Sequence, residues 1–172
     1  MNGRNELKIN AWKDKTGTTP KFEHSFPDGF TLVIDTREQD AFFKRPLKGL
    51  TIVRDTLQTG DYSVRGFENC IAVERKSLPD FLSSIGHNRD RFQEELGRLQ
   101  GYERRWIFLE SIHEDCLKFN EFSQMHPNNV RQTIASIEIR YGIPIYFQPD
   151  RHFMERHLLD LFVKYYRVKR GE

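Results

Sequence analysis

The sequence has little cysteine, no long apolar segment and almost no excess of charge of either sign. Its two cysteines, Cys70 and Cys116, form no C-x-x-C pair and are too few for a disulfide framework, which favours a reducing compartment. No run approaches the ~18 consecutive apolar residues of a membrane-spanning helix. The first residues lack the apolar core of a secretory signal. We therefore expect an intracellular protein, in the cytoplasm or nucleoid, with no membrane contact.

The charge balance excludes a histone-like polycation and an acidic tail protein, because 27 Lys and Arg offset 25 Asp and Glu. The six histidines form no H-x-x-x-H pair, so their spacing gives little support for zinc. The 14 Phe, 6 Tyr and 2 Trp argue against disorder, since aromatic side chains bury much area. A chain of 172 residues has the size of one domain, so we expect a single core.

Local patterns divide the chain into an irregular N-terminal arm, residues 1–28, and a single domain, residues 29–172. The arm is either a frayed terminus or a segment that contacts phosphates. Short apolar runs predict strands, and apolar residues spaced i, i+4, i+7 predict helices. The predicted strands are 30–35, 51–57, 62–64, 69–76, 104–111 and 143–148, and the predicted helices are 78–85, 88–102, 128–142 and one through 154–165. This order predicts an α/β domain with a central mixed β-sheet flanked by helices.

Acidic residues stand at the ends of several predicted strands. Asp35 ends one buried strand and Asp61 opens another. Because side chains alternate across a strand, Glu74 and Lys76 share one face and Arg75 points to the other. If these strands are neighbours, three carboxylates and one ammonium meet at one edge of the sheet.

This combination of groups suits phosphodiester hydrolysis. Hard cations such as Mg²⁺ take carboxylate, water and phosphate oxygens as ligands. A bound metal ion polarises a phosphoryl oxygen and lowers the pKa of its water, and a nearby lysine can hold that water or stabilise the phosphate charge. Each element alone also has a structural explanation. Gly60-Asp61 is a common turn pair, and Ser77 with Asp80 fits a helix capping box.

Four short motifs follow one another in a fixed order: Asp35-Thr36-Arg37-Glu38, Gly60-Asp61, Glu74-Arg75-Lys76 and, after three residues, Asp80. This order resembles the nuclease domain of the XPF family of structure-specific DNA endonucleases. The signature of that family is G-D-x(n)-E-R-K-x-x-x-D, preceded by a strand that ends in D-x-R-E. The resemblance covers roughly residues 30–165.

The resemblance implies a restriction-endonuclease-like core and DNA cleavage that depends on Mg²⁺ or Mn²⁺, with no small-molecule cofactor. It assigns metal binding to Asp35, Asp61 and Glu74, and catalysis to these three residues together with Lys76. Supporting roles fall to four further residues of the motifs, Arg37, Glu38, Arg75 and Asp80. The family also places an arginine early in the next helix, and Arg91, with Arg89 as second candidate, matches it as a DNA contact. These arginines otherwise belong to a solvated face with pairs such as Arg91 with Glu95.

The resemblance further implies branched or structured DNA as substrate, in repair or recombination. Because nuclease domains of the family pair, the apolar faces of the last two helices serve either a homodimer contact or the core. The chain lacks helix-hairpin-helix and helicase modules, so we expect a stand-alone prokaryotic or phage form. Three alternatives remain: a junction resolvase, a restriction-type nuclease of the same core, or a catalytically inactive module that binds DNA or a partner.

Overall fold

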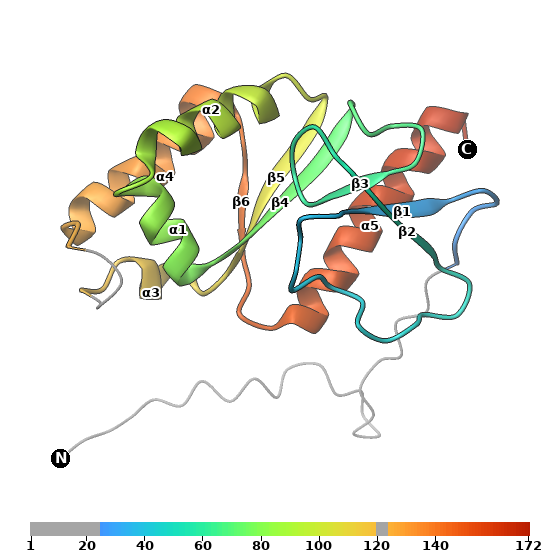
Figure 1. The fold of residues 1–172 in the computed structure, drawn as a ribbon, viewed down its shortest axis with the longest axis horizontal. Coiled ribbons are helices and arrows are strands. Elements are labelled where there is room, and N and C mark those ends of the chain that lie inside the picture. The colour runs from blue at the N-terminus through green and yellow to red at the C-terminus, as the bar shows by residue number, and fades with distance from the viewer. Residues whose placement is uncertain (1–24, 120–123) are drawn as a thin grey trace, which may run out of the picture.

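Six strands form one mixed sheet that carries helices on both faces (Figure 1). The computed structural model describes residues 25–119 and 124–172. The elements in chain order are β1 (Thr31–Asp35), β2 (Thr51–Asp55), β3 (Tyr62–Val64), β4 (Ile71–Ser77), α1 (Leu78–Ile85), α2 (Arg89–Gln100), β5 (Arg104–Glu110), α3 (His113–Cys116), α4 (Pro127–Tyr141), β6 (Ile145–Phe147) and α5 (Arg151–Arg170).

The strand order in the sheet is β2-β1-β3-β4-β5-β6. β3 runs antiparallel to both of its neighbours, β1 and β4, whereas the β1–β2, β4–β5 and β5–β6 pairs are parallel. The predicted α/β class with a central mixed sheet is therefore confirmed. Ten of the eleven elements coincide with predicted ones to within a few residues, and the exception is the four-residue helix α3.

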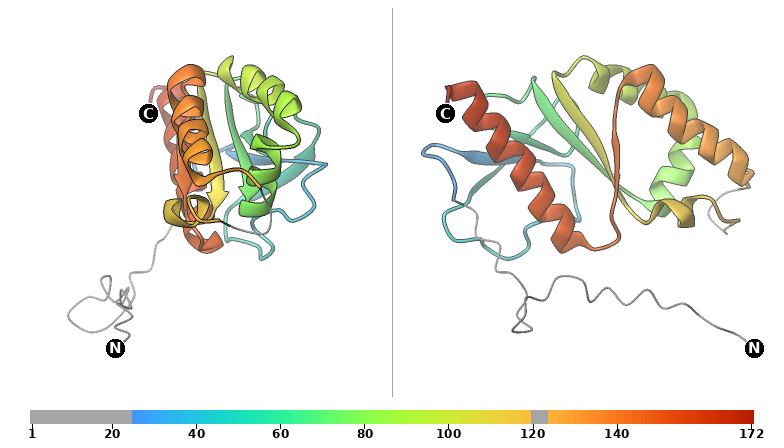
Figure 2. Two further views of the ribbon diagram at one scale, coloured as in Figure 1. Left: turned by 90° about the vertical axis from the view of Figure 1, so that its left-hand side faces the viewer. Right: turned by 180° about the vertical axis from the view of Figure 1, so that it is seen from behind.

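Alternation along β4 divides the core between the two faces of the sheet. Ile71 and Val73 pack with α5, whereas Ala72 packs with α1, α2 and α4. Figure 2 shows α5 crossing the β1–β3 half of the sheet, with α1, α2 and α4 gathered toward β5 and β6. By the same alternation, Glu74 and Lys76 continue the α2 side of the strand and Arg75 continues the α5 side.

The predicted N-terminal arm lies outside the described residues up to position 24. Ser25 and Asp28 contact the end of α5, because Arg167 Nη2 donates to the Ser25 carbonyl at 3.1 Å and the Tyr166 hydroxyl donates to the Asp28 carbonyl at 3.2 Å. Within residues 25–119 and 124–172, no helix combines the length and the apolar character that crossing a bilayer requires.

Gly60 shapes the turn that delivers Asp61 to the sheet. Its φ is +83°, and a Cβ there would lie 3.0 Å from the Cβ of Ala72 and 3.2 Å from the carbonyl oxygen of Val73. The next residue, Asp61, donates its N–H to that same carbonyl at 2.9 Å. The chain therefore needs both a left-handed conformation and close contact with β4 at this position, and only glycine provides both.

We expect Gly60→Ala to lower the free energy of unfolding by about 2–4 kcal/mol, because left-handed strain and overpacking each cost about 1–3 kcal/mol. Gly66→Ala is the matched control, since Gly66 has a φ of +85° and a methyl group added there would meet nothing within 4 Å. That variant should lose only about 1–2 kcal/mol from the backbone strain. Urea denaturation measures both, and equal losses would contradict the packing argument.

Candidate active site

One cavity of about 570 Å³ lies between the ends of β1 and β4 and helices α1 and α2. It is lined by all but one of the residues that the sequence singled out: Asp35, Arg37, Glu38, Asp61, Glu74, Arg75, Lys76, Asp80 and Arg91. The residue that does not line it is Arg89, which lines a separate groove between α2 and α4. The fold thus brings the strand-end acids and the lysine to one place.

Asp61 is held between β1 and β4 by its backbone. Its N–H donates to the Val73 carbonyl at 2.9 Å, and its own carbonyl accepts from the Asp35 N–H at 2.8 Å. Its side-chain Oδ2 accepts from the Arg75 N–H at 2.8 Å. Burial raises the pKa of Asp61 to about 7, although the hydrogen bond from Arg75 opposes that rise.

The ammonium group of Lys76 lies between two carboxylates and an aromatic ring. Its Nζ donates to Glu74 Oε1 at 2.9 Å, lies 3.5 Å from Glu95 Oε1 and sits 5.1 Å from the centre of the Phe92 ring. The side chains of Glu74 and Lys76 are only 12% and 11% exposed. Burial, followed by the charge of Asp61, raises the pKa of Glu74 well above its usual range. Burial alone would lower the pKa of Lys76, but Glu74 and Glu95 outweigh it and raise that pKa.

Both side-chain oxygens of Asp35 are already engaged. Oδ1 accepts from the N–H and Nε of Arg37 at 2.8 and 2.7 Å, and Oδ2 accepts from Arg37 Nη2 at 2.9 Å and the Leu57 N–H at 2.7 Å. Burial would raise the pKa of Asp35, but these hydrogen bonds outweigh it and lower that pKa. In this arrangement Asp35 fixes the guanidinium of Arg37 at the cavity wall.

The sequence predicted that Asp35, Asp61 and Glu74 converge on one ion. In the described part of the chain, no three His, Cys, Asp or Glu side chains are grouped so that they could hold a metal ion together. The side chains present fit a smaller set, because Mg²⁺ is often bound by one or two carboxylates with water and substrate phosphate. Asp61 and Glu74 can form such a pair, because both carboxylates are buried at the cavity and burial, followed for Glu74 by the charge of Asp61, raises the pKa of each. Metal binding itself stays a prediction.

Arg75 lies on the opposite face of β4 and anchors the segment after β1. Its guanidinium contacts Glu110 at 2.5 Å, Asp40 at 3.1 Å and Glu38 at 3.4 Å, while its side chain is only 10% exposed. Arg151, at the start of α5, binds the same Glu110 at 2.9 Å. The ion pair of Arg75 with Glu38 therefore stabilises the segment after β1 from the opposite face of the sheet. The Arg75 N–H orients the side chain of Asp61.

Asp80 has the structural role that its capping box suggested. The Ser77 hydroxyl accepts from the Asp80 N–H at 3.2 Å and donates to Asp80 Oδ2 at 2.6 Å, so the pair begins α1. The carboxylate of Asp80 is exposed and also lines the cavity. Its position permits a supporting role at the rim in addition to the cap.

Helix α2 supplies the residue that the sequence analysis missed, Glu95. The sequence offered Glu95 as a surface partner of Arg91, but Glu95 instead turns to Lys76 and leaves Arg91 with no partner among the described residues. The signal was its position three residues after Phe92 and one before Leu96, which places it beside the buried face of the helix. Arg91 and Arg98 line the cavity as exposed cations.

Comparison with known proteins identifies first the fold and then the family. XPF from Aeropyrum pernix in complex with DNA has a TM-score of 0.59 at 20% identity, over 81% of this chain and 66% of that one. XPF from Aeropyrum pernix in another structure has a TM-score of 0.53 at 23% identity, over 70% and 57%. The predicted restriction-endonuclease-like core, that of the XPF nuclease domain, is therefore confirmed.

The family model of the ERCC4 domain matches residues 34–161, so this chain belongs to the ERCC4 domain family. It is also 30% identical over 116 residues to the MJ1505 protein of Methanocaldococcus jannaschii, which carries the name of an ATP-dependent RNA helicase. That match spans 67% of this chain but only 13% of the archaeal protein. The predicted resemblance to the XPF family is confirmed by the family model and the two structures.

Proposed function

We propose that this chain is a metal-dependent endodeoxyribonuclease that hydrolyses phosphodiester bonds in branched or structured DNA. The observation that carries the proposal is the cavity where Asp61, Glu74 and Lys76 meet at the end of the sheet. Membership of the ERCC4 domain family supports the nuclease class, and the similarity to XPF solved in complex with DNA supports DNA as the substrate.

Asp61 and Glu74 would hold Mg²⁺ or Mn²⁺, and Asp35 would join them only by giving up bonds to Arg37. When bound, the ion supplies a Lewis acid for the phosphoryl oxygen and a more acidic water. Lys76 stays protonated between Glu74 and Glu95, so its ammonium can hold the attacking water or the charge that develops on the phosphate. Because the cavity is partly buried, that charge is stabilised more strongly there than in open water.

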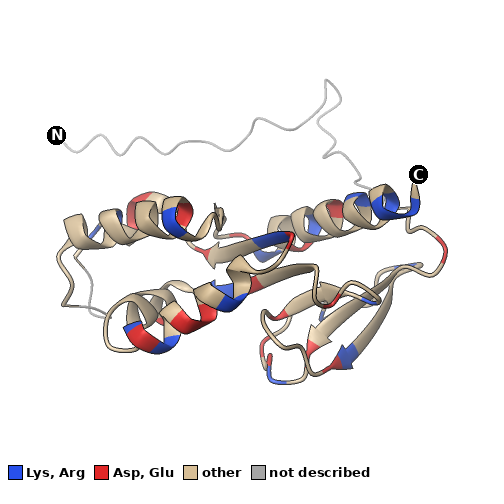
Figure 3. Ribbon diagram, turned by 90° about the horizontal axis from the view of Figure 1, so that it is seen from above, with Lys and Arg blue, Asp and Glu red and all other residues tan. Residues whose placement is uncertain are grey.

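The DNA backbone would be bound by arginines at the walls of the cavity. Arg91 and Arg98 project from α2, and Arg37 lies opposite with its side chain 67% exposed. Figure 3 shows Lys and Arg interspersed with Asp and Glu over most of the molecule, with basic residues gathered near the C-terminal end of α5. With a net charge of +2, we expect modest affinity that falls steeply with salt.

Metal affinity should depend on pH through Asp61 and Glu74. Burial raises both pKa values, that of Asp61 to about 7, so Asp61 takes up a proton below neutrality and must lose it when metal binds. We expect the apparent affinity for Mn²⁺ to fall about tenfold for each proton displaced per pH unit below about pH 7. Calorimetry between mild acid and mild alkali measures it, and a flat affinity across that range would contradict the assignment.

A substrate panel tests the proposed function and separates it from the alternatives. Labelled flap, fork, four-way junction and linear duplex are each incubated with Mg²⁺ or Mn²⁺, and with EDTA as the metal-free control. The proposal expects metal-dependent cutting of flaps or forks. Cutting of junctions alone would favour a resolvase, and cutting of linear duplex at fixed sequences would favour a restriction-type enzyme. DNA binding without cutting under any condition would indicate an inactive module.

A homodimer is a second proposal, carried by the resemblance to a family whose nuclease domains pair. The apolar faces of α4 and α5 are used chiefly in the core, where Val130, Ile134 and Leu158 are buried. Phe153 and Val168, 43% and 58% exposed on α5, are left for a contact. Sedimentation at micromolar concentration should then give twice the 20.5 kDa of the chain, and a mass of one chain would contradict pairing.

A further inference from the structure

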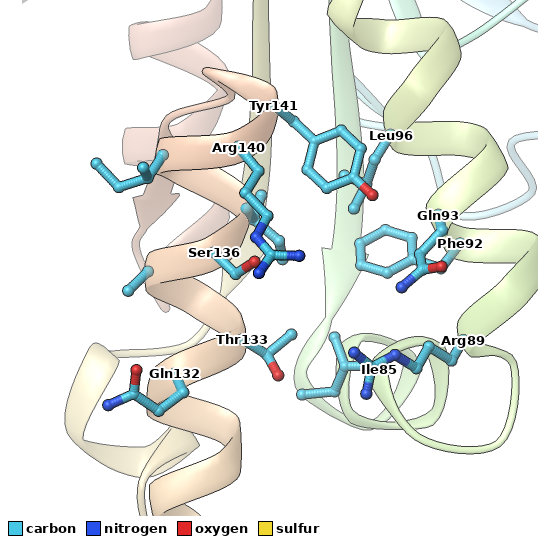
Figure 4. Close-up of a pocket in the computed structure, with 13 residues that line it drawn as sticks. Ile85, Arg89, Phe92, Gln93, Leu96, Gln132, Thr133, Ser136, Arg140 and Tyr141 are labelled. Atoms are coloured by element: carbon cyan, nitrogen blue, oxygen red, sulfur yellow. The ribbon is translucent and has the colours of Figure 1, made fainter.

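A second groove, of about 460 Å³, runs between α2 and α4 on the other side of α2 from the catalytic cavity. Figure 4 shows Arg89 and Gln93 reaching into it from α2, and Thr133, Ser136 and Arg140 from α4. None of the described residues that line it is acidic. A groove with two arginines and no carboxylate selects an anionic ligand.

Both arginines of this groove are unpaired among the described residues. Within the part of the chain that the structure describes, the guanidinium groups of Arg89 and Arg140 have neither an ion pair nor a hydrogen bond, and both residues are exposed. The remaining lining mixes amide and hydroxyl groups with the exposed side chain of Ile139 and the partly buried ring of Tyr141, while Ile85, Phe92 and Leu96 form a buried floor. Charged walls with apolar and aromatic surface between them suit a nucleic-acid strand, whose phosphates and bases need both.

The groove and the catalytic cavity lie on two sides of the first turns of α2. Phe92 lines both hollows, and Arg91 in the cavity stands only two residues from Arg89 in the groove. The helix begins at Arg89 without a side-chain cap from Asn88, so its first N–H groups also face a passing phosphate favourably. A strand that leaves the cavity past Arg91 would therefore meet Arg89 and then Arg140.

We propose that the α2–α4 groove binds a single-stranded arm of the DNA substrate as the arm leaves the catalytic cavity. This inference rests on the proposed function, because it takes DNA as the ligand of the neighbouring cavity. It gives a physical reason for a preference for forked DNA, since linear duplex has no free strand to occupy the groove.

The test measures binding in EDTA, so that it does not depend on cleavage. Fluorescence anisotropy compares a fork with one oligothymidine arm and the same duplex without the arm. We expect Arg140→Gln, alone or with Arg89→Gln, to weaken binding of the fork about tenfold and to lower its salt slope by about 1 for each arginine. Binding of the armless duplex should change less than about twofold.

Arg131→Gln is the matched control, because Arg131 is an exposed arginine on the same helix that does not line the groove. Equal effects of Arg140→Gln and Arg131→Gln on the fork would overturn the proposal, and so would equal losses for the fork and the armless duplex. Failure of wild-type protein to cut any DNA with Mg²⁺ would instead refute the proposed function, while the anisotropy result would still report on the groove.

Discussion

Asp61→Asn and Glu74→Gln should each lower the cleavage rate of forked DNA by at least about 10³-fold, the upper end of what one transition-state donor contributes. Each change removes a carboxylate charge from the proposed metal pair and keeps nearly the same shape. Asn at position 61 can still accept the hydrogen bond from the Arg75 N–H. Single-turnover cleavage of labelled fork at saturating Mg²⁺ measures the effect.

Loss of folding cannot mimic this result. The folded-state pKa of Asp61 lies above its unfolded value, so its ionised form costs stability as pH rises from about 4 to about 7, and that cost is fully present at pH 8. Asp61→Asn should therefore be at least as stable as wild type at pH 8. Glu94→Gln is the control, because Glu94 is exposed on α2 and does not line the cavity. Undiminished cutting by both cavity variants would contradict the assignment.

Arg75→Met should lower the free energy of unfolding by about 3–5 kcal/mol, the cost of removing one partner from a buried ion pair. The change leaves Glu38 and Glu110, whose side chains are only 8% and 17% exposed, without their shared cation. The segment after β1 would also lose its tie to β4, although Arg151 would still hold Glu110. Urea denaturation at neutral pH measures the loss.

The matched control is Arg65→Met. Arg65 also contacts two carboxylates, Asp55 at 2.9 Å and Glu68 at 3.1 Å, but its side chain is 46% exposed. Surface pairs contribute about 0–1 kcal/mol, so this variant should stay near wild type. If both variants lost the same amount, burial of the Arg75 cluster would not be what stabilises this part of the fold.

Much of the site could be predicted because the two-residue periodicity of a strand determines which face of the sheet each side chain occupies. Alternation alone placed Glu74 and Lys76 on one face and Arg75 on the other, and the structure has them so, since Ala72 and Val73 pack on opposite sides. Apolar spacing likewise located every helix of eight or more residues. These features are local, and each depends on only a few consecutive side chains.

The features that the sequence left undetermined are those set by pairing across the fold. The Leu57 N–H donates to Asp35 because the segment after β2 passes beside the end of β1. The local sequence pattern of either strand does not specify this arrangement. Glu95 reaches Lys76 because α2 packs over the end of β4, and its Arg91 alternative was equally consistent with the sequence. Arg91 was the first candidate for the DNA contact and Arg89 the second, and the rotation of α2 places Arg91 in the cavity and Arg89 in the separate groove.

The most direct measurement is a calorimetric titration of Mn²⁺ into wild-type protein, Asp61→Asn and Glu74→Gln at pH 8. Our account predicts saturable binding by wild type and at least about tenfold weaker binding by each variant, because each lacks one of the two carboxylates that hold the ion. Identical titration curves for the three proteins, or no heat with wild type, would contradict the claim that this cavity is a metal-dependent cleavage site.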